Sequence, residues 1–129
     1  MNGEEKQPSQ LFIRACREIE NFALAEVKKE AQTKKLYYHN LNHVYGVKRR
    51  ANIIFQSLKP TLINKINIKE LNRIYYLLNI CAVAHDLVQE FSFSIDRKQR
   101  RERPVGLSET LTIDKLIARI QQIERELSV

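Results

Sequence analysis

The chain is 129 residues long and carries a net charge of +7 at pH 7, and 43% of its residues are hydrophobic. This length fits one domain with a core of its own, and the scarcity of Gly and Pro, three of each, favours long helices over a turn-rich β-sandwich. No stretch reaches the roughly 18 uninterrupted apolar residues of a membrane span, so no membrane partner is expected. The positive charge indicates attraction to an anionic partner, without choosing among a nucleotide, a nucleic acid and an acidic protein.

The N-terminal part of the chain predicts a loose leader and one long helix. Residues 1–8 form the leader, which is polar and does not resemble a signal peptide. A single domain is expected over residues 9–129. From Ser9, a residue that can cap a helix, apolar residues recur at spacings of three and four to about Ala31. The expected apolar face of this helix consists of Leu11, Phe12, Ala15, Ile19, Phe22 and Ala23.

A second helix is expected to begin near Asn40 or Asn42, because Asn caps helix starts by accepting a bond from a free backbone N–H. Pro60 is expected to end this helix, since proline lacks the N–H that a helix interior needs. The predicted buried stripe consists of Val44, Val47, Ala51, Ile54 and Leu58.

A third helix is predicted from Ile68 to about Glu90, and the apolar density of residues 77–88 favours a central position, buried on most sides. One face of it should carry Leu71, Ile74, Leu78, Cys81, Ala82 and His85. The two cysteines, Cys16 and Cys81, lie in apolar helical patterns and form no C-x-x-C pair. We therefore expect buried free thiols, a reducing compartment and a cytoplasmic location.

Residues 91–107 interrupt the helical pattern and predict a long, exposed, basic loop. Its cations within seven positions are Arg97, Lys98, Arg100, Arg101 and Arg103. Guanidinium groups match phosphate in a bidentate way, so the loop could bind a nucleotide or a nucleic acid. A solvated loop partly balanced by Glu102 is the favoured interpretation, and nucleic acid is not the favoured partner.

The C-terminal residues predict a fourth helix capped by Ser108, with Glu109 supplying early negative charge. Its expected apolar face consists of Ile113, Ile117, Ile120 and Leu127, with Leu116 and Ile123 beside them. The predicted fold class is therefore all-α, a compact bundle of about four main helices.

All three histidines fall in two short segments of the chain. His39 and His43 are four residues apart, and His85 directly precedes Asp86. Histidine is the commonest neutral metal ligand, and carboxylates are the usual anionic partners of hard divalent ions. A buried Asp is costly unless it is paired or coordinates a cation, and no Lys or Arg lies within residues 75–89 to pair with it. The pattern predicts a metal site, with His85 pointing inward.

Two motifs carry these residues. They are Tyr38-His39-Asn40-Leu41-Asn42-His43-Val44 and Ala82-Val83-Ala84-His85-Asp86, and His85 lies 42 residues after His43. Together they resemble the HD-domain superfamily of metal-dependent phosphohydrolases, whose ligand pattern is H…HD…D, over roughly residues 36–90. The resemblance implies an HD-like helical fold in which His43, His85 and Asp86 bind a divalent metal ion. The first motif also resembles the opening of the cyclic-nucleotide phosphodiesterase motif, which implies that His39 protonates the leaving oxygen.

The family pattern ends with an Asp on a helix well downstream of the His-Asp pair. Only Asp96 and Asp114 follow Asp86 in this chain. Asp96 falls in the predicted basic loop, too close for the usual arrangement, and Asp114 is expected to be a solvated carboxylate of the fourth helix. Glu90 is expected to be an exposed residue at a helix end. The chain therefore resembles the front portion of an HD domain: a fragment, a shortened homologue, or a protein that takes its last ligand from elsewhere.

Three functional classes remain open from the sequence. The resemblance implies a metal-dependent phosphohydrolase acting on a nucleotide or small phosphoester, with Mn, Fe, Co, Ni, Zn or Mg as its ion. The alternative is a non-catalytic HD-like module that binds a metal or nucleotide or has a regulatory role. The third class is a basic helical domain that binds nucleic acid or protein, with structural histidines. Exposed apolar surface left by missing helices would favour a homodimer.

Overall fold

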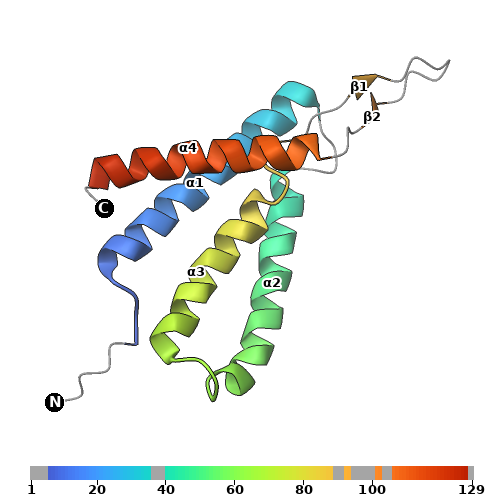
Figure 1. Ribbon diagram of the computed structural model, residues 1–129. Helices are drawn as coiled ribbons and strands as arrows, with labels where there is room; N and C mark the ends of the chain where they lie inside the picture. The colour runs from blue at the N-terminus through green and yellow to red at the C-terminus, as the bar shows by residue number, and fades with distance from the viewer. Residues whose placement is uncertain (1–5, 36–39, 89–91, 94–100, 103–105, 128–129) are drawn as a thin grey trace.

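The described residues fold into helices and one short ribbon. The computed structural model describes residues 6–35, 40–88, 92–93, 101–102 and 106–127. In chain order, its elements are α1 (Gln10–Lys34), α2 (Leu41–Leu62), α3 (Ile68–Ala84), β1 (Ser92–Phe93), β2 (Arg101–Glu102) and α4 (Leu107–Leu127). α2 and α3 run side by side in opposite directions, and α4 packs along α1 (Figure 1). The predicted all-α bundle of about four helices is confirmed.

The ends of α1 follow from local backbone chemistry. Ser9 caps the helix as predicted, since its side-chain oxygen accepts a 3.1 Å hydrogen bond from the N–H of Phe12. The helix continues past the predicted end to Lys34. It closes with Lys35 in the left-handed conformation (φ 53°), whose N–H donates to the carbonyl of Ala31. The buried residues of α1 are Ile13, Cys16, Ile19, Ala23 and Val27.

α2 begins at one of the two predicted caps and ends later than predicted. Asn40 is the N-cap, but the helix runs through Pro60 to Leu62. The prediction that Pro60 ends the helix is therefore wrong: the helix lacks the one hydrogen bond that Pro60 cannot donate and continues for two more residues. Beyond it, the N–H of Ile63 still donates to the carbonyl of Lys59 at 2.9 Å.

The buried stripe of α2 is rotated relative to the predicted one. Val44 and Phe55 are buried, whereas Ile54 and Leu58 are 60% and 51% exposed. A helix advances about 100° per residue, so Phe55 points about 20° away from Val44 and Ile54 about 80° away from it. The stripe that faces the rest of the molecule therefore passes through Phe55. The predicted residues that are half-buried are Val47 and Ala51.

α3 packs against both α1 and α2, which confirms its central position. Its buried residues are Leu71, Asn79, Ala82, Val83 and Ala84. However, Ile74, Leu77 and Cys81 are exposed. The predictions that α3 is buried on most sides and that Cys81 is a buried thiol are therefore wrong. The reason is that α4 packs along α1 rather than along α3 and leaves this face open (Figure 1).

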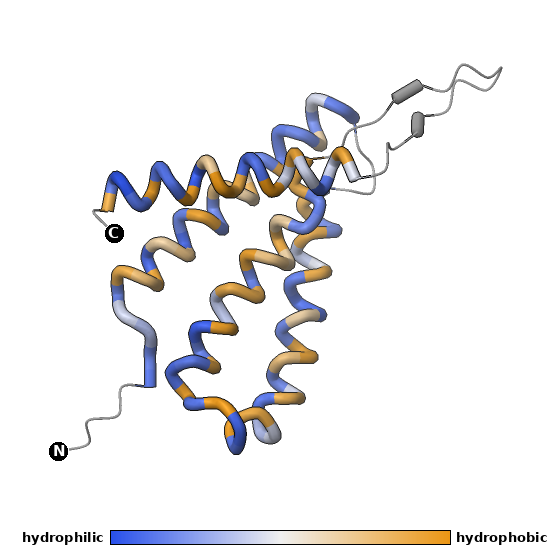
Figure 2. Tube along the Cα trace, viewed as in Figure 1, coloured by the Kyte–Doolittle hydropathy of each residue, from blue (hydrophilic) through white to orange (hydrophobic). Residues whose placement is uncertain are grey.

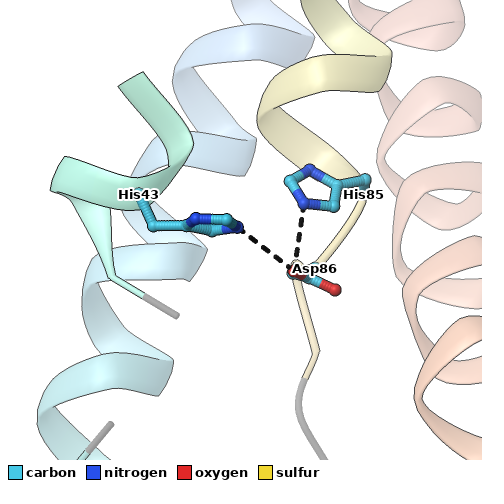
Figure 3. Close-up of side chains that lie close together, drawn as sticks. All are labelled: His43, His85 and Asp86. Atoms are coloured by element: carbon cyan, nitrogen blue, oxygen red, sulfur yellow. Dashed lines mark ion pairs between the residues drawn. The ribbon is translucent and has the colours of Figure 1, made fainter. Parts of the chain in front are cut away.

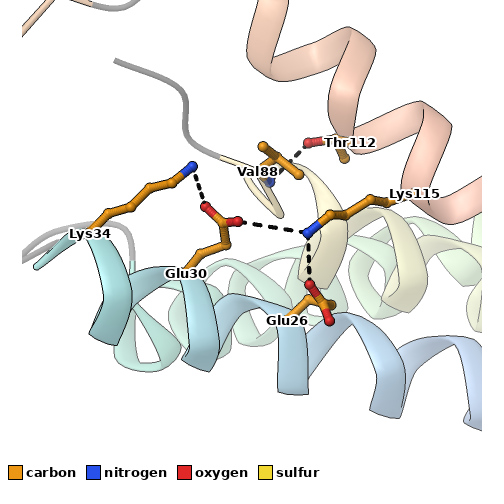
Figure 4. A network of polar contacts seen from close by, with 6 residues as sticks. All are labelled: Glu26, Glu30, Lys34, Val88, Thr112 and Lys115. Atoms are coloured by element: carbon orange, nitrogen blue, oxygen red, sulfur yellow. Dashed lines mark hydrogen bonds and ion pairs between the residues drawn. The ribbon is translucent and has the colours of Figure 1, made fainter. Parts of the chain in front are cut away.

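α4 buries a different face from the predicted one. Ser108 is the second residue of the helix and is buried, rather than being its cap. Its other buried residues are Thr112 and Ile123, and the exposed residues of the predicted apolar face are Ile113, Ile117 and Ile120. In this orientation α4 forms ion pairs with α1: Lys115 Nζ lies 2.9 Å from Glu26 Oε2 and 3.7 Å from Glu30 Oε1 (Figure 4).

The hydrophobic core lies where α1, the start of α2 and the end of α3 meet. Its members are Ala23, Val27, Val44, Val83, Ala84, Leu87 and Val88. Hydrophobic positions recur along every helix rather than gathering in one segment (Figure 2). No helix in the described part of the chain combines the length and apolar character needed to cross a membrane.

The predicted basic loop contains the β1–β2 ribbon. The two strands are antiparallel, with Ser92 opposite Glu102 and Phe93 opposite Arg101. The predicted loop therefore includes a short antiparallel strand pair, which the sequence did not indicate. The cations of the predicted loop that lie outside the described residues are Arg97, Lys98, Arg100 and Arg103.

Candidate metal centre

The antiparallel arrangement of α2 and α3 brings the two histidine motifs together. His43 lies in the first turn of α2, where its backbone N–H donates a 3.1 Å hydrogen bond to Oδ1 of the cap residue Asn40. α3 ends at Ala84 rather than near the predicted Glu90, so His85 and Asp86 lie in the turn that follows it. Because the start of one helix and the end of the other share one end of the pair, these side chains face each other (Figure 3).

The three side chains form a compact cluster around one carboxylate oxygen. Asp86 Oδ2 lies 3.0 Å from His85 Nε2 and 3.6 Å from His43 Nε2. One ligand atom from each residue lies within 4.8 Å of the other two. The imidazole rings are tilted by 59°, with their centroids 5.5 Å apart. Both dashed contacts in Figure 3 therefore end on the same residue, Asp86.

A contact with a backbone carbonyl determines which ring nitrogen of His85 carries a hydrogen. Its Nδ1 lies 2.7 Å from the carbonyl oxygen of Ala82. A carbonyl oxygen can only accept, so Nδ1 must carry the hydrogen. In the neutral ring, Nε2 then presents a lone pair to Asp86 Oδ2. Two acceptors 3.0 Å apart repel each other unless a positive charge lies between them, either a proton on Nε2 or a metal cation.

The donor set and the two distances from Asp86 Oδ2 fit a divalent ion. Two donor atoms bound to one ion at about 2.0–2.2 Å lie about 2.8–3.6 Å apart for angles between roughly 90° and 109°. Both distances from Asp86 Oδ2 fall within that range. Two imidazole nitrogens and a carboxylate oxygen suit Mn, Fe, Co, Ni or Zn.

The cluster is sheltered on one side and open on the other. The side chains of His43 and Asp86 are 14% and 13% exposed, whereas that of His85 is 37% exposed. The prediction that His85 points inward is therefore wrong: it lies at the open edge because α3 ends just before it. A ligand could reach the cluster from this edge.

Not every predicted site residue can be placed. His39, Glu90 and Asp96 lie outside the described residues. Asp114 is exposed on α4, as predicted, and does not belong to the cluster. Within the part of the chain that the structure describes, no further carboxylate joins His43, His85 and Asp86. The role of the three as metal ligands stays a prediction.

The sequence alone did not indicate how α4 supports the cluster. The buried hydroxyl oxygen of Thr112 accepts a 3.0 Å hydrogen bond from the N–H of Val88 (Figure 4). This bond ties the segment directly after Asp86 to α4. A threonine inside an apolar helical pattern was the available signal, but threonine is common on helix faces and does not by itself indicate a partner.

Comparison of the chain with protein-family models, with curated proteins and with solved structures finds no match. Functional inference therefore depends on the chemistry of the cluster itself.

Proposed function

We propose that this protein is a metal-dependent phosphohydrolase of the HD-domain type that acts on a nucleotide or small phosphoester. His43, His85 and Asp86 are its metal ligands. The observation that carries the proposal is the contact of two imidazole nitrogens with one carboxylate oxygen, in which the Ala82 carbonyl holds His85 in the form that offers Nε2. Such a contact is relieved by a proton or a metal cation between the two atoms, and the proposal assigns the metal.

The three residues have separable roles in this proposal. Asp86 supplies the negative charge and His43 the second nitrogen, both from the sheltered side of the cluster. His85 supplies a nitrogen at the open edge, where the phosphoryl group arrives. A divalent ion held by these three residues would polarise a phosphoryl oxygen and would lower the pKa of bound water towards neutrality. His39 would protonate the leaving oxygen, as the motif resemblance implies.

One observation favours a second function, a non-catalytic module that binds a metal or nucleotide. The described residues supply three ligands, and no second carboxylate joins them. Three ligands are enough to bind an ion. The family pattern has a fourth, anionic ligand, and its absence among the described residues argues against catalysis more strongly than against metal binding.

Metal analysis of purified protein tests the site. We expect one divalent ion per chain after incubation with Mn²⁺ or Co²⁺, and loss of most of that ion in His43→Ala and His85→Ala. Asp114→Asn is the matched control, because it removes an exposed carboxylate outside the cluster and should leave the metal content unchanged. Unchanged metal content in both histidine variants would contradict the site.

A phosphoester panel then separates the two functions. Hydrolysis that requires the added ion and is lost in His85→Ala supports the phosphohydrolase. Bound metal without turnover of any ester supports the non-catalytic module.

A further inference from the structure

A pocket of about 320 Å³ adjoins the candidate metal centre and shares one residue, His85, with it. It lies between the end of α3 and the start of α4, and α4 stands on the side of His85 away from His43 (Figure 3). Its lining consists of Cys81, Ala84, His85, Glu109, Thr112, Ile113 and Leu116. The volume falls at the lower end of the range of about 300–1,000 Å³ typical of small-molecule pockets.

The lining is unsuited to phosphate and suited to an apolar group. Its described lining residues include no Lys or Arg to pair with an anion. Thr112 adds little polarity, because its hydroxyl oxygen is buried and already accepts a bond from the N–H of Val88. Aliphatic side chains of Ile113 and Leu116 complete the wall.

The position of the pocket ties it to the cluster. His85 presents Nε2 to Asp86 and also forms part of the pocket wall, so a ligand in the pocket lies directly beside the open edge of the metal centre. One molecule can therefore meet both surfaces if its anionic group and its apolar group are joined directly.

We propose that this pocket binds the apolar body of the phosphoester whose phosphoryl group meets His43, His85 and Asp86. Of the two substrate classes in the proposed function, this selects the small phosphoester over the nucleotide: a phosphate ester of an aromatic or similarly apolar alcohol, with sugar phosphates and polyphosphates disfavoured. This inference rests on the proposed phosphohydrolase. Hydrolysis breaks the ester P–O bond, and water supplies the hydroxyl group to phosphorus and the proton to the alcohol.

Cys81 offers a direct reporter of pocket occupancy. It is exposed and lines the pocket, whereas Cys16 is buried and its burial raises the pKa of its thiol above the usual range, which slows its alkylation. Alkylation by uncharged iodoacetamide, followed by peptide mass mapping, therefore measures access to Cys81 separately from Cys16.

The test compares two esters on Mn²⁺-loaded protein. At about ten times its Kd, 1-naphthyl phosphate should slow alkylation of Cys81 about tenfold, because it leaves about one tenth of the pocket free. Glycerol 2-phosphate at the same concentration should give little protection. Ile113→Glu should abolish the protection while metal content is retained. Ile117→Glu is the matched control, because Ile117 is similarly exposed one turn further along α4 and does not line the pocket.

The outcomes distinguish this inference from the proposed function. Bound metal and ester hydrolysis, with equal protection by both esters or none by either, would overturn the inference and leave the phosphohydrolase standing. Absence of both metal binding and hydrolysis overturns the two together. Protection by 1-naphthol but not by 1-naphthyl phosphate also overturns the inference, since the pocket then takes apolar compounds unconnected with the metal centre.

Discussion

Asp86 sets the chemistry of the candidate metal centre, because one of its oxygens faces two imidazole nitrogens. His85 cannot relieve the contact by changing tautomer, since the Ala82 carbonyl requires a hydrogen on Nδ1. His85 Nε2 and Asp86 Oδ2 therefore repel each other whenever neither a proton nor a metal ion lies between them.

The substitution Asp86→Asn tests this repulsion between His85 and Asp86. The introduced amide can donate to His85 Nε2, so we expect the metal-free variant to be at least as stable as the metal-free parent. The parent should gain about 2.7 kcal/mol when the ion is present at 100 times its Kd, and the variant should gain almost nothing. Thermal unfolding in the presence of a chelator measures the stability of each metal-free protein, and thermal unfolding with Mn²⁺ measures the stability that the ion adds. A variant that Mn²⁺ stabilises as strongly as the parent would contradict the assignment.

At the scale of elements, the cluster is held by the start of α2, by the end of α3 and by one hydrogen bond from the segment after α3 to α4. The cap Asn40 fixes the first turn of α2 beneath His43, and Thr112 on α4 fixes the segment after Asp86. Three helices therefore support the cluster, although its candidate ligands come only from α2 and from the turn that follows α3.

Removal of the α2 cap by Asn40→Ala should cost about 1 kcal/mol of stability. It should also weaken metal binding, because His43 lies in the turn that frays. Asn67→Ala is the matched control: Asn67 caps α3 in the same way, by accepting from Lys69 N–H at 2.8 Å, but it lies at the opposite end of α3 from the cluster. Urea unfolding and metal titration should show similar stability losses in the two variants and weaker metal binding in Asn40→Ala alone.

Thr112→Val should leave the buried N–H of Val88 without its acceptor, at a cost of about 1–3 kcal/mol, and should lower metal affinity. Thr112→Ser keeps the hydroxyl and should restore most of both. Thr110→Val removes an exposed bond to the carbonyl of Gly106, and we expect it to change stability by less than about 0.5 kcal/mol. Equal losses in Thr112→Val and Thr110→Val would show that the bond to Val88 does not support the site.

At the scale of the whole molecule, the helices leave a large amount of apolar side chain in water. Exposed large hydrophobic residues include Ile74 and Leu77 on α3 and Ile113, Ile117 and Ile120 on α4. These residues lie on the sides of α3 and α4 that the sequence predicted to be buried. Exposed apolar surface of this kind favours association.

The homodimer predicted from the sequence therefore stays a prediction that light scattering can check. At micromolar concentration, we expect a mass of about twice the monomer, falling to the monomer in Leu77→Glu. Ile53→Glu on α2 is a control of equal charge at a residue that is also exposed, outside the α3 and α4 faces. A parent that is monomeric throughout this range would contradict the prediction.

The sequence by itself determined the features that depend on neighbours in the chain. Helix-forming spacing and capping act over a few residues, so all four helices were predictable, together with the starts of α1, α2 and α3. The two motifs also singled out His43, His85 and Asp86, which the structure brings together.

Tertiary structure decided which faces are buried, since each helix carries apolar residues over more than one face. In the packed structure, Phe55 is buried and Ile54 exposed on α2, and Thr112 is buried and Ile113 exposed on α4. The pocket beside His85 follows from that packing, because it forms only where α4 crosses the end of α3. Local propensity cannot specify such a crossing, which is fixed by interhelical contacts between residues far apart in the sequence.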